Sequence, residues 1–158
     1  MGFPFKHVIT RHTMNGKFFL SACILLPSLL AASAASKKAI LIVDDDRPLT
    51  ELLVHYLEEE GYETAVAHNG EDALNIYSKD PDRIALVLTD HNMPKKSGQE
   101  LAKEVLKIRP QAHIILQSGN IANCMDTLSK DKDLSSVIFL AKPFTKSQLI
   151  AAVRLKLH

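Results

Sequence analysis

The sequence predicts a doubly wound α/β domain built on a five-stranded parallel sheet. Three observations support this fold class: short apolar runs recur along the chain, they are rich in β-branched residues, and helical patterns separate them. Continuous apolar runs are typical of parallel strands that are buried on both faces. Because each run is followed by a helical pattern, helices are expected to cover both faces of the sheet. The five runs are Ala39–Val43, Thr64–Ala67, Ile84–Leu88, His113–Leu116 and Val137–Leu140.

The segments between the runs carry apolar residues at helical spacing. In the first, Leu49 to Leu57 follow the i, i+3, i+4 pattern, with Pro48 in the first turn, Gly61 at the exit and Asp46 as the expected N-cap. The later patterns are Gly70–Ser78, a stripe of Leu101, Val105 and Ile108, a weak pattern near Ile121–Lys130, and one that follows Thr145 with Leu149, Ala152 and Val153.

Composition places the chain among ordinary globular proteins. It has 158 residues, 46% of them hydrophobic, and a formal net charge of +1, which indicates one domain with a sizeable core. The balanced charge predicts no nucleic-acid contact. Cys23 and Cys124 are far apart, so neither a disulfide framework nor a zinc site is indicated.

The first 36 residues differ from the rest. Phe18 to Ala35 form an uncharged apolar run behind a basic head, and Ala32 to Ala34 read Ala-Ser-Ala. This pattern is typical of a secretory signal peptide. A membrane anchor through residues 18–35 and an extension from a wrongly assigned start are the alternative interpretations.

Polar residues gather where the predicted strands end. In parallel α/β sheets the ligand site lies outside the carboxyl ends of the strands. Clustered carboxylates repel one another and favour a hard cation such as Mg²⁺, while a lysine offers a point charge for a phosphoryl group. Asp90, at the end of a central strand, is a candidate nucleophile. The residues at these ends are Asp44, Asp45, Asp46, Asp90, Ser118, Lys142 and Pro143.

Four motifs in this order resemble the response regulator receiver domain of two-component signalling. They are "IVDDD", "LVLTDHNMPKKSGQEL", "IILQSG" and "KPF", and the resemblance extends from Lys38 to about Lys156. It implies a flavodoxin-like (CheY-like) fold with strand order 2-1-3-4-5, a receiver domain over residues 37–158 and a separate apolar segment over residues 1–36. Since one helical pattern follows Lys142, a stand-alone receiver is expected.

The resemblance also implies a role for each residue of the site. Asp90 would be the phosphoacceptor, and Lys142 would pair with it or its phosphate. Asp45 and Asp90 would bind Mg²⁺ with the backbone carbonyl of Asn92, and Asp44 would act through water. Ser118 would be the switch hydroxyl and Phe139 the switch aromatic residue, where tyrosine is frequent. The peptide bond between Lys142 and Pro143 would be cis.

The implied function is Mg²⁺-dependent transfer of a phosphoryl group to Asp90. The donor would be a sensor histidine kinase or a phosphotransfer protein in the cytoplasm. A downstream protein would bind the face made by the fourth helix, fifth strand and fifth helix. Such a receiver is a signalling phosphoacceptor and not an enzyme. Two alternatives remain: a Mg²⁺-dependent phosphohydrolase of the haloacid dehalogenase type, and a receiver-like interaction module that is not phosphorylated.

Overall fold

Five parallel strands form one sheet in the order β2-β1-β3-β4-β5, which confirms the predicted topology. The structure is a computed structural model that describes residues 38–120 and 134–157. Every strand pairs in parallel with its neighbour. The strands are β1 (Ala39–Val43), β2 (Glu63–Ala67), β3 (Ile84–Asp90), β4 (His113–Ser118) and β5 (Ile138–Ala141).

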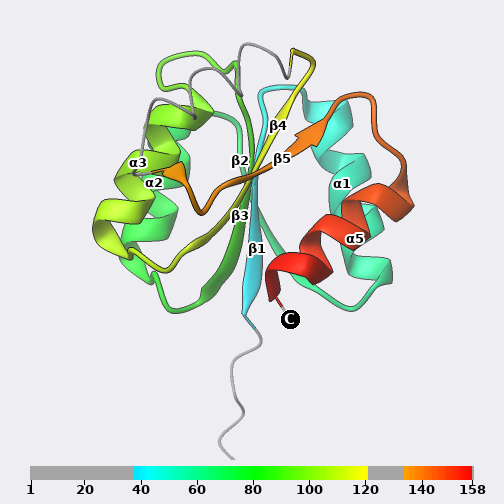
Figure 1. The fold of residues 1–158 in the computed structure, drawn as a ribbon, viewed down its shortest axis with the longest axis horizontal. Helices are drawn as coiled ribbons and strands as arrows, with labels where there is room; N and C mark the ends of the chain where they lie inside the picture. Colours follow the sequence, from blue (N-terminus) through cyan, green and yellow to red (C-terminus); the bar gives the residue numbers. More distant parts are fainter. Residues whose placement is uncertain (1–37, 121–133, 158) are drawn as a thin grey trace, which may run out of the picture. The chain divides into compact units, whose positions relative to one another are not determined.

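Helices cover both faces of the sheet. Figure 1 shows α1 and α5 on one face and α2 and α3 on the other. The helices are α1 (Arg47–Glu59), α2 (Gly70–Lys79), α3 (Gly98–Ile108) and α5 (Lys146–Leu157). The helix predicted near Ile121–Lys130 and the segment 1–36 lie outside the described residues, so the interpretations placed on them stay predictions. Over the described ranges, no helix has the length and apolar character needed to cross a membrane.

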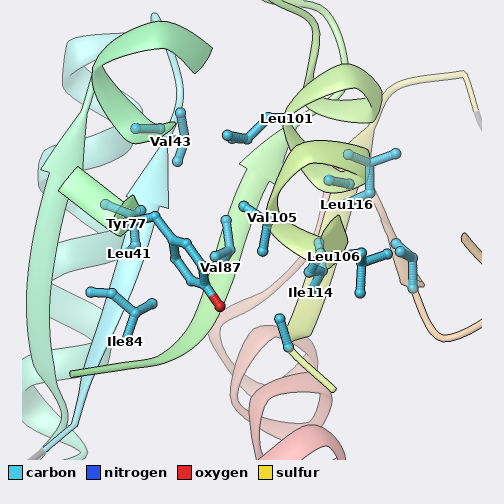
Figure 2. Close-up of a cluster of buried hydrophobic side chains, with 14 of the residues drawn as sticks. Leu41, Val43, Tyr77, Ile84, Val87, Leu101, Val105, Leu106, Ile114 and Leu116 are labelled. Carbon is cyan, nitrogen blue, oxygen red and sulfur yellow. The ribbon is translucent and has the colours of Figure 1, made fainter. Parts of the chain in front are cut away.

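The sheet separates two apolar clusters, because alternate side chains of a strand point to opposite faces. On the side of α2 and α3, Leu41, Val87 and Ile114 pack against the helices. Figure 2 shows this cluster, with the Tyr77 ring lying among Leu41, Ile84 and Val87. On the other side, α1 and α5 cover a second cluster that includes Ile42, Leu88, Ile115, Leu140 and Val153.

Two details of the predicted core are wrong. The run Thr64–Ala67 was expected to be buried on both faces, but Val66 is exposed and Thr64 and Ala65 are only partly buried, because β2 is an edge strand. Ile108 was expected on the buried stripe of α3, yet it is 44% exposed. The buried face of α3 instead includes Ala102 and Leu106 beside Leu101 and Val105. Ile108 is the last residue of the helix and lies beyond the part that packs on the core.

Side chains at the helix ends explain where the helices begin and end. Asp46 accepts a hydrogen bond from the backbone N–H of Leu49 at 3.2 Å, as the sequence predicted. Thr145 accepts one from the N–H of Gln148 at 3.3 Å, so it caps α5 as expected. At the end of α1, Gly61 has a φ of 83°, a left-handed conformation that glycine adopts without strain.

Candidate functional site

Four polar side chains meet at the carboxyl end of the sheet, beyond the apolar cluster that α1 and α5 cover. Asp44 follows β1, Asp90 ends β3, Gln117 lies in β4 and Lys142 follows β5. Asp90 and Gln117 are paired in register. Along each strand these residues continue the alternation that points Ile42, Leu88 and Ile115 to the same face. The strand pattern therefore brings four residues from distant parts of the chain into one layer.

The ammonium group of Lys142 joins two carboxylates. Its Nζ lies 2.8 Å from Oδ2 of Asp44 and 2.5 Å from Oδ1 of Asp90. Burial by itself lowers the pKa of Lys142, but the hydrogen bonds and charges of Asp44 and Asp90 outweigh it and hold that pKa above its ordinary value. Lys142 is therefore a fixed positive charge between β1 and β3 at neutral pH.

Asp44 is almost fully buried, with 1% of its surface exposed, and each of its carboxylate oxygens has a donor. Oδ1 accepts a hydrogen bond from the backbone N–H of Asp46 at 3.0 Å. Oδ2 accepts from Lys142 and, at 2.8 Å, from the side-chain Nε2 of Gln117. A buried carboxylate without such donors would lose its hydration uncompensated, so these contacts hold Asp44 in place.

Asp90 is held by the loop that follows it. Its Oδ2 accepts a hydrogen bond from the backbone N–H of Asn92 at 2.7 Å. The loop returns at Gly98, whose N–H donates to the carbonyl of His91 at 3.1 Å. A Cβ atom on Gly98 would lie only 2.0 Å from the carbonyl oxygen of Asp90, so the first residue of α3 packs directly on its backbone. Glycine is required there to let α3 start against the end of β3.

Asp45 is the third carboxylate of this edge, and it differs from the other two. It is exposed and, in the described part of the chain, has neither a hydrogen bond nor an ion pair. Three carboxylates (Asp44, Asp45 and Asp90) against the single ammonium of Lys142 leave a formal charge of −2, which a divalent cation would neutralise.

The donor set fits Mg²⁺ better than a metal that needs an all-protein cage. In residues 38–120 and 134–157 no three His, Cys, Asp or Glu side chains form a ready-made metal cluster. Mg²⁺ does not need one, since it keeps several waters and takes one or two carboxylates together with phosphate oxygens. The partnerless carboxylate of Asp45 beside Asp44 is the observation that makes the edge suitable for this ion. Asp45 as its main ligand, Asp44 acting through water and the carbonyl of Asn92 stay predictions.

Ser118 and Phe139 make none of the side-chain contacts of Lys142, although the backbone N–H of Lys142 donates to the carbonyl of Ser118 at 2.9 Å. Ser118 is 2% exposed, and its Oγ accepts a hydrogen bond from the backbone N–H of Asn120 at 3.1 Å. Phe139 is partly buried and packs against the cluster on the side of α2 and α3. Their switch roles stay predictions. The peptide bond between Lys142 and Pro143 is cis, as the resemblance implied.

Gln117 received no role in the sequence analysis, although it binds Asp44 in the structure. The signal available in the sequence was a polar residue at the end of an apolar run, in "IILQSG", and the structure shows that this residue is fully buried. The sequence could not show its partner, because Gln117 and Asp44 are 73 residues apart.

A groove of about 450 Å³ borders the site between α1 and the loop that leads into α5. Lys142 contributes to its wall, and Leu52, which is 43% exposed, contributes an apolar surface from α1. The other lining residues are Leu49, Leu53, Tyr56, Pro143, Phe144, Thr145 and Lys146.

Comparison with known proteins identifies relatives over most of the chain. A family model for the response regulator receiver domain matches residues 40–154. The transcriptional regulatory protein CpxR of Escherichia coli (strain K12) is 39% identical over 110 residues, which are 70% of this chain and 45% of that protein. The chain thus spans about half the length of the curated relatives it matches.

Solved structures show the same fold. A response regulator receiver domain protein from Clostridium thermocellum has a TM-score of 0.67 and 27% identity, covering 76% of this chain and 94% of that one. The chemotaxis protein CheY4 of Vibrio cholerae has a TM-score of 0.67 and 25% identity, covering 75% of this chain and 97% of that one.

Proposed function

Because the chain belongs to the response regulator receiver domain family, we propose that it accepts a phosphoryl group on Asp90 from a phosphohistidine donor. The observation that carries this proposal is the ammonium of Lys142, which joins the carboxylates of Asp44 and Asp90. A receiver of this kind relays a signal through protein contacts, and it is a member of a family of signalling regulators.

The proposed transfer is an in-line displacement. An oxygen of Asp90 attacks the phosphorus atom, the bond between phosphorus and the donor imidazole nitrogen breaks, and the imidazole keeps the electron pair and takes up a proton. Such transfers depend on positioning and charge neutralisation. Lys142 provides a positive charge next to Asp90, and the N–H of Asn92 orients its carboxylate. Mg²⁺ bound by Asp45 and Asp90 would supply Lewis-acid neutralisation of the phosphoryl oxygens.

Phosphorylation would then change the affinity for a downstream partner. The acyl phosphate carries about −1.5 to −2 charges, by analogy with other phosphorylated side chains. The hydroxyl of Ser118, now bonded to Asn120, would turn to the phosphoryl group, and Phe139 would repack. The face proposed for the downstream partner includes β5 and α5, and its fourth helix lies outside the described residues. The change is a population shift between two states.

The test is phosphorylation of the purified chain by a small acyl phosphate in the presence of Mg²⁺. Wild type should gain one phosphoryl group by intact-mass spectrometry, and Asp90→Asn should gain none. The matched control is Asp82→Asn, which removes a carboxylate near the other end of β3 and should be labelled like wild type. Equal labelling of wild type and Asp90→Asn would reject Asp90 as the acceptor. Absence of labelling in all three would favour the interaction module that is not phosphorylated.

We further propose that the phosphohistidine donor docks in the groove between α1 and the loop before α5. The groove leads to Lys142, and Leu52 offers an apolar contact there. Leu52→Glu should slow transfer from a phosphohistidine protein while leaving labelling by a small acyl phosphate unchanged. Leu155→Glu is the control, because Leu155 is 75% exposed on α5 and does not line the groove. Equal slowing by both variants would contradict the docking site.

The phosphohydrolase alternative is not favoured by any contact in the described residues. Its own test is turnover of a phosphate monoester, which the proposed receiver should lack. A cytoplasmic location follows from the need for an ATP-fed kinase, and we propose it on that ground. Sequencing the N-terminus of the native protein decides whether residues 1–36 are removed, retained as an anchor or never made.

A further inference from the structure

Gln117 is a polar residue at a position where the strand pattern calls for an apolar one. Its side chain is fully buried, and it lies on the face of β4 that carries Ile115. It uses Nε2 to donate to Oδ2 of Asp44, the same oxygen that binds Lys142. The amide can present only its N–H to an ionised carboxylate, since the carbonyl end would repel it.

The other end of the Gln117 amide has no partner. Oε1 is buried and accepts no hydrogen bond from the described residues. A buried acceptor without a donor destabilises the folded state, so a residue chosen for stability alone would not be polar here. The hydrogen bond to Asp44 is the one polar contact that the side chain of Gln117 makes with the described residues.

Lys142 cannot serve Asp44 and a phosphoryl group on Asp90 equally. Its ammonium is shared between Asp44 and Asp90 in this structure. A phosphoryl group on Asp90 would add negative charge within reach of that ammonium and would draw it away from Asp44. Oδ2 of Asp44 would then be a buried carboxylate oxygen without a cation, and Gln117 is the neutral donor that stays.

We propose that Gln117 is a positioning residue that holds the Asp44 carboxylate in place when Lys142 turns to the phosphoryl group. This inference rests on the proposed function. Asp44 is 1% exposed, so its carboxylate depends on the donors packed around it, and Gln117 already donates to it from the neighbouring strand. Gln117 therefore stabilises the site more when a phosphoryl group is on Asp90 than when Asp90 is unmodified. Partners held behind a metal site commonly change metal affinity by about 10- to 100-fold.

The test compares Gln117→Met with wild type in thermal unfolding, with and without Mg²⁺ and beryllium fluoride as a phosphoryl analogue. Met has a similar length and no polar atom that must be satisfied, so it removes both the bond to Asp44 and the unpaired Oε1. Without ligands the variant should unfold at the same temperature as wild type or higher. The increase caused by Mg²⁺ with beryllium fluoride should be clearly smaller, since ligand stabilisation follows binding affinity.

Calorimetric titration of Mg²⁺ in the presence of beryllium fluoride gives the affinity directly, and a weakening of about tenfold is expected. Ile115→Met is the matched control, because it places methionine on the same face of β4 at a position that has no polar group to donate to Asp44. Its Mg²⁺ affinity should equal that of wild type. Gln117→Leu serves as a second variant and should behave like Gln117→Met.

The outcomes separate the inference from the proposed function. If wild type itself gains no stability from Mg²⁺ and beryllium fluoride, the proposed function fails. If wild type gains stability and Gln117→Met gains as much, the positioning role is overturned. Lower stability without ligands together with an unchanged ligand effect would mean a purely structural role. If neither Gln117→Met nor Gln117→Leu folds, the role of Gln117 is also purely structural.

Discussion

Replacing Gly98 by alanine tests how closely α3 is built against the phosphoacceptor strand. The added Cβ would lie 2.0 Å from the carbonyl oxygen of Asp90 and 2.8 Å from Cδ1 of Leu116. A Cβ atom essentially never lies closer than 3.0 Å to another heavy atom. The distance between the added Cβ and the carbonyl oxygen of Asp90 must therefore increase from 2.0 to at least 3.0 Å, which requires the backbone to move. The obstacle is backbone, which cannot rotate away as a side chain could.

The magnitude follows from two opposing effects. Forcing extra atoms into a packed site destabilises by about 1–3 kcal/mol or more, and alanine in place of glycine at a helical position recovers up to about 1 kcal/mol. Because a backbone carbonyl is displaced, we expect the upper end of the first range and a net loss of about 2–3 kcal/mol. Displacing the backbone of Asp90 by about 1 Å should also slow phosphorylation by about 100-fold.

Urea unfolding followed by far-ultraviolet circular dichroism measures the stability change, since the chain has no tryptophan to report by fluorescence. Gly119→Ala is the control. Its added Cβ would meet no heavy atom within 4 Å, although Gly119 also lies at the end of a strand in the site. Its unfolding free energy should stay within about 0.5 kcal/mol of wild type. Equal unfolding midpoints for Gly98→Ala and Gly119→Ala would refute the reasoning.

Three further predictions concern the site and the helix that supports it. Lys142→Met should lower the unfolding free energy by about 3 kcal/mol, because Asp44 is left buried without a cation. In thermal unfolding, Mg²⁺ should restore part of this loss of stability. An unfolding free energy equal to that of wild type would contradict the ion pairs of Lys142 with Asp44 and Asp90. Ser97→Ala should cost about 1 kcal/mol, because the N-cap bond to the backbone N–H of Glu100 is lost; urea unfolding measures it, and an unchanged midpoint would count against the cap. The backbone N–H and hydroxyl of Ser97 hold the pKa of Glu100 below its ordinary value of 4.5. A lowered carboxyl pKa stabilises the fold above the ordinary value and loses that effect as the pH falls through the lowered one. Wild type should therefore exceed Glu100→Gln in stability at pH 7 and match it at low pH, and a gap that persists in acid would disprove the assignment.

Local signals predicted the elements well. The cap of α1 at Asp46 involves residues three positions apart, so spacing alone was sufficient to identify it. The exit of α1 at Gly61 was predicted for the same reason, because a left-handed residue favours glycine wherever the chain goes next. Ile108 was placed wrongly, since helical periodicity does not say where α3 leaves the sheet.

For the site as well, the sequence predicted where the residues lie along the chain but not the contacts between them. The sequence placed Asp44, Asp90 and Lys142 at strand ends, and parallel pairing brings such ends to one edge. It could not say which oxygen meets which donor. Lys142 is 98 residues from Asp44 and 52 from Asp90, and the choice between them depends on the register of four strands.

The amino-acid sequence by itself determined the five strands and the N-caps of α1 and α5, because each depends on neighbours a few residues away, and it placed the acidic residues at the ends of strands. Only the tertiary structure decided that Gln117 would share Asp44 with Lys142, and that Gly98 would press against the carbonyl of Asp90. These contacts join side chains or backbone across strands, and strand register is set by packing over the whole sheet.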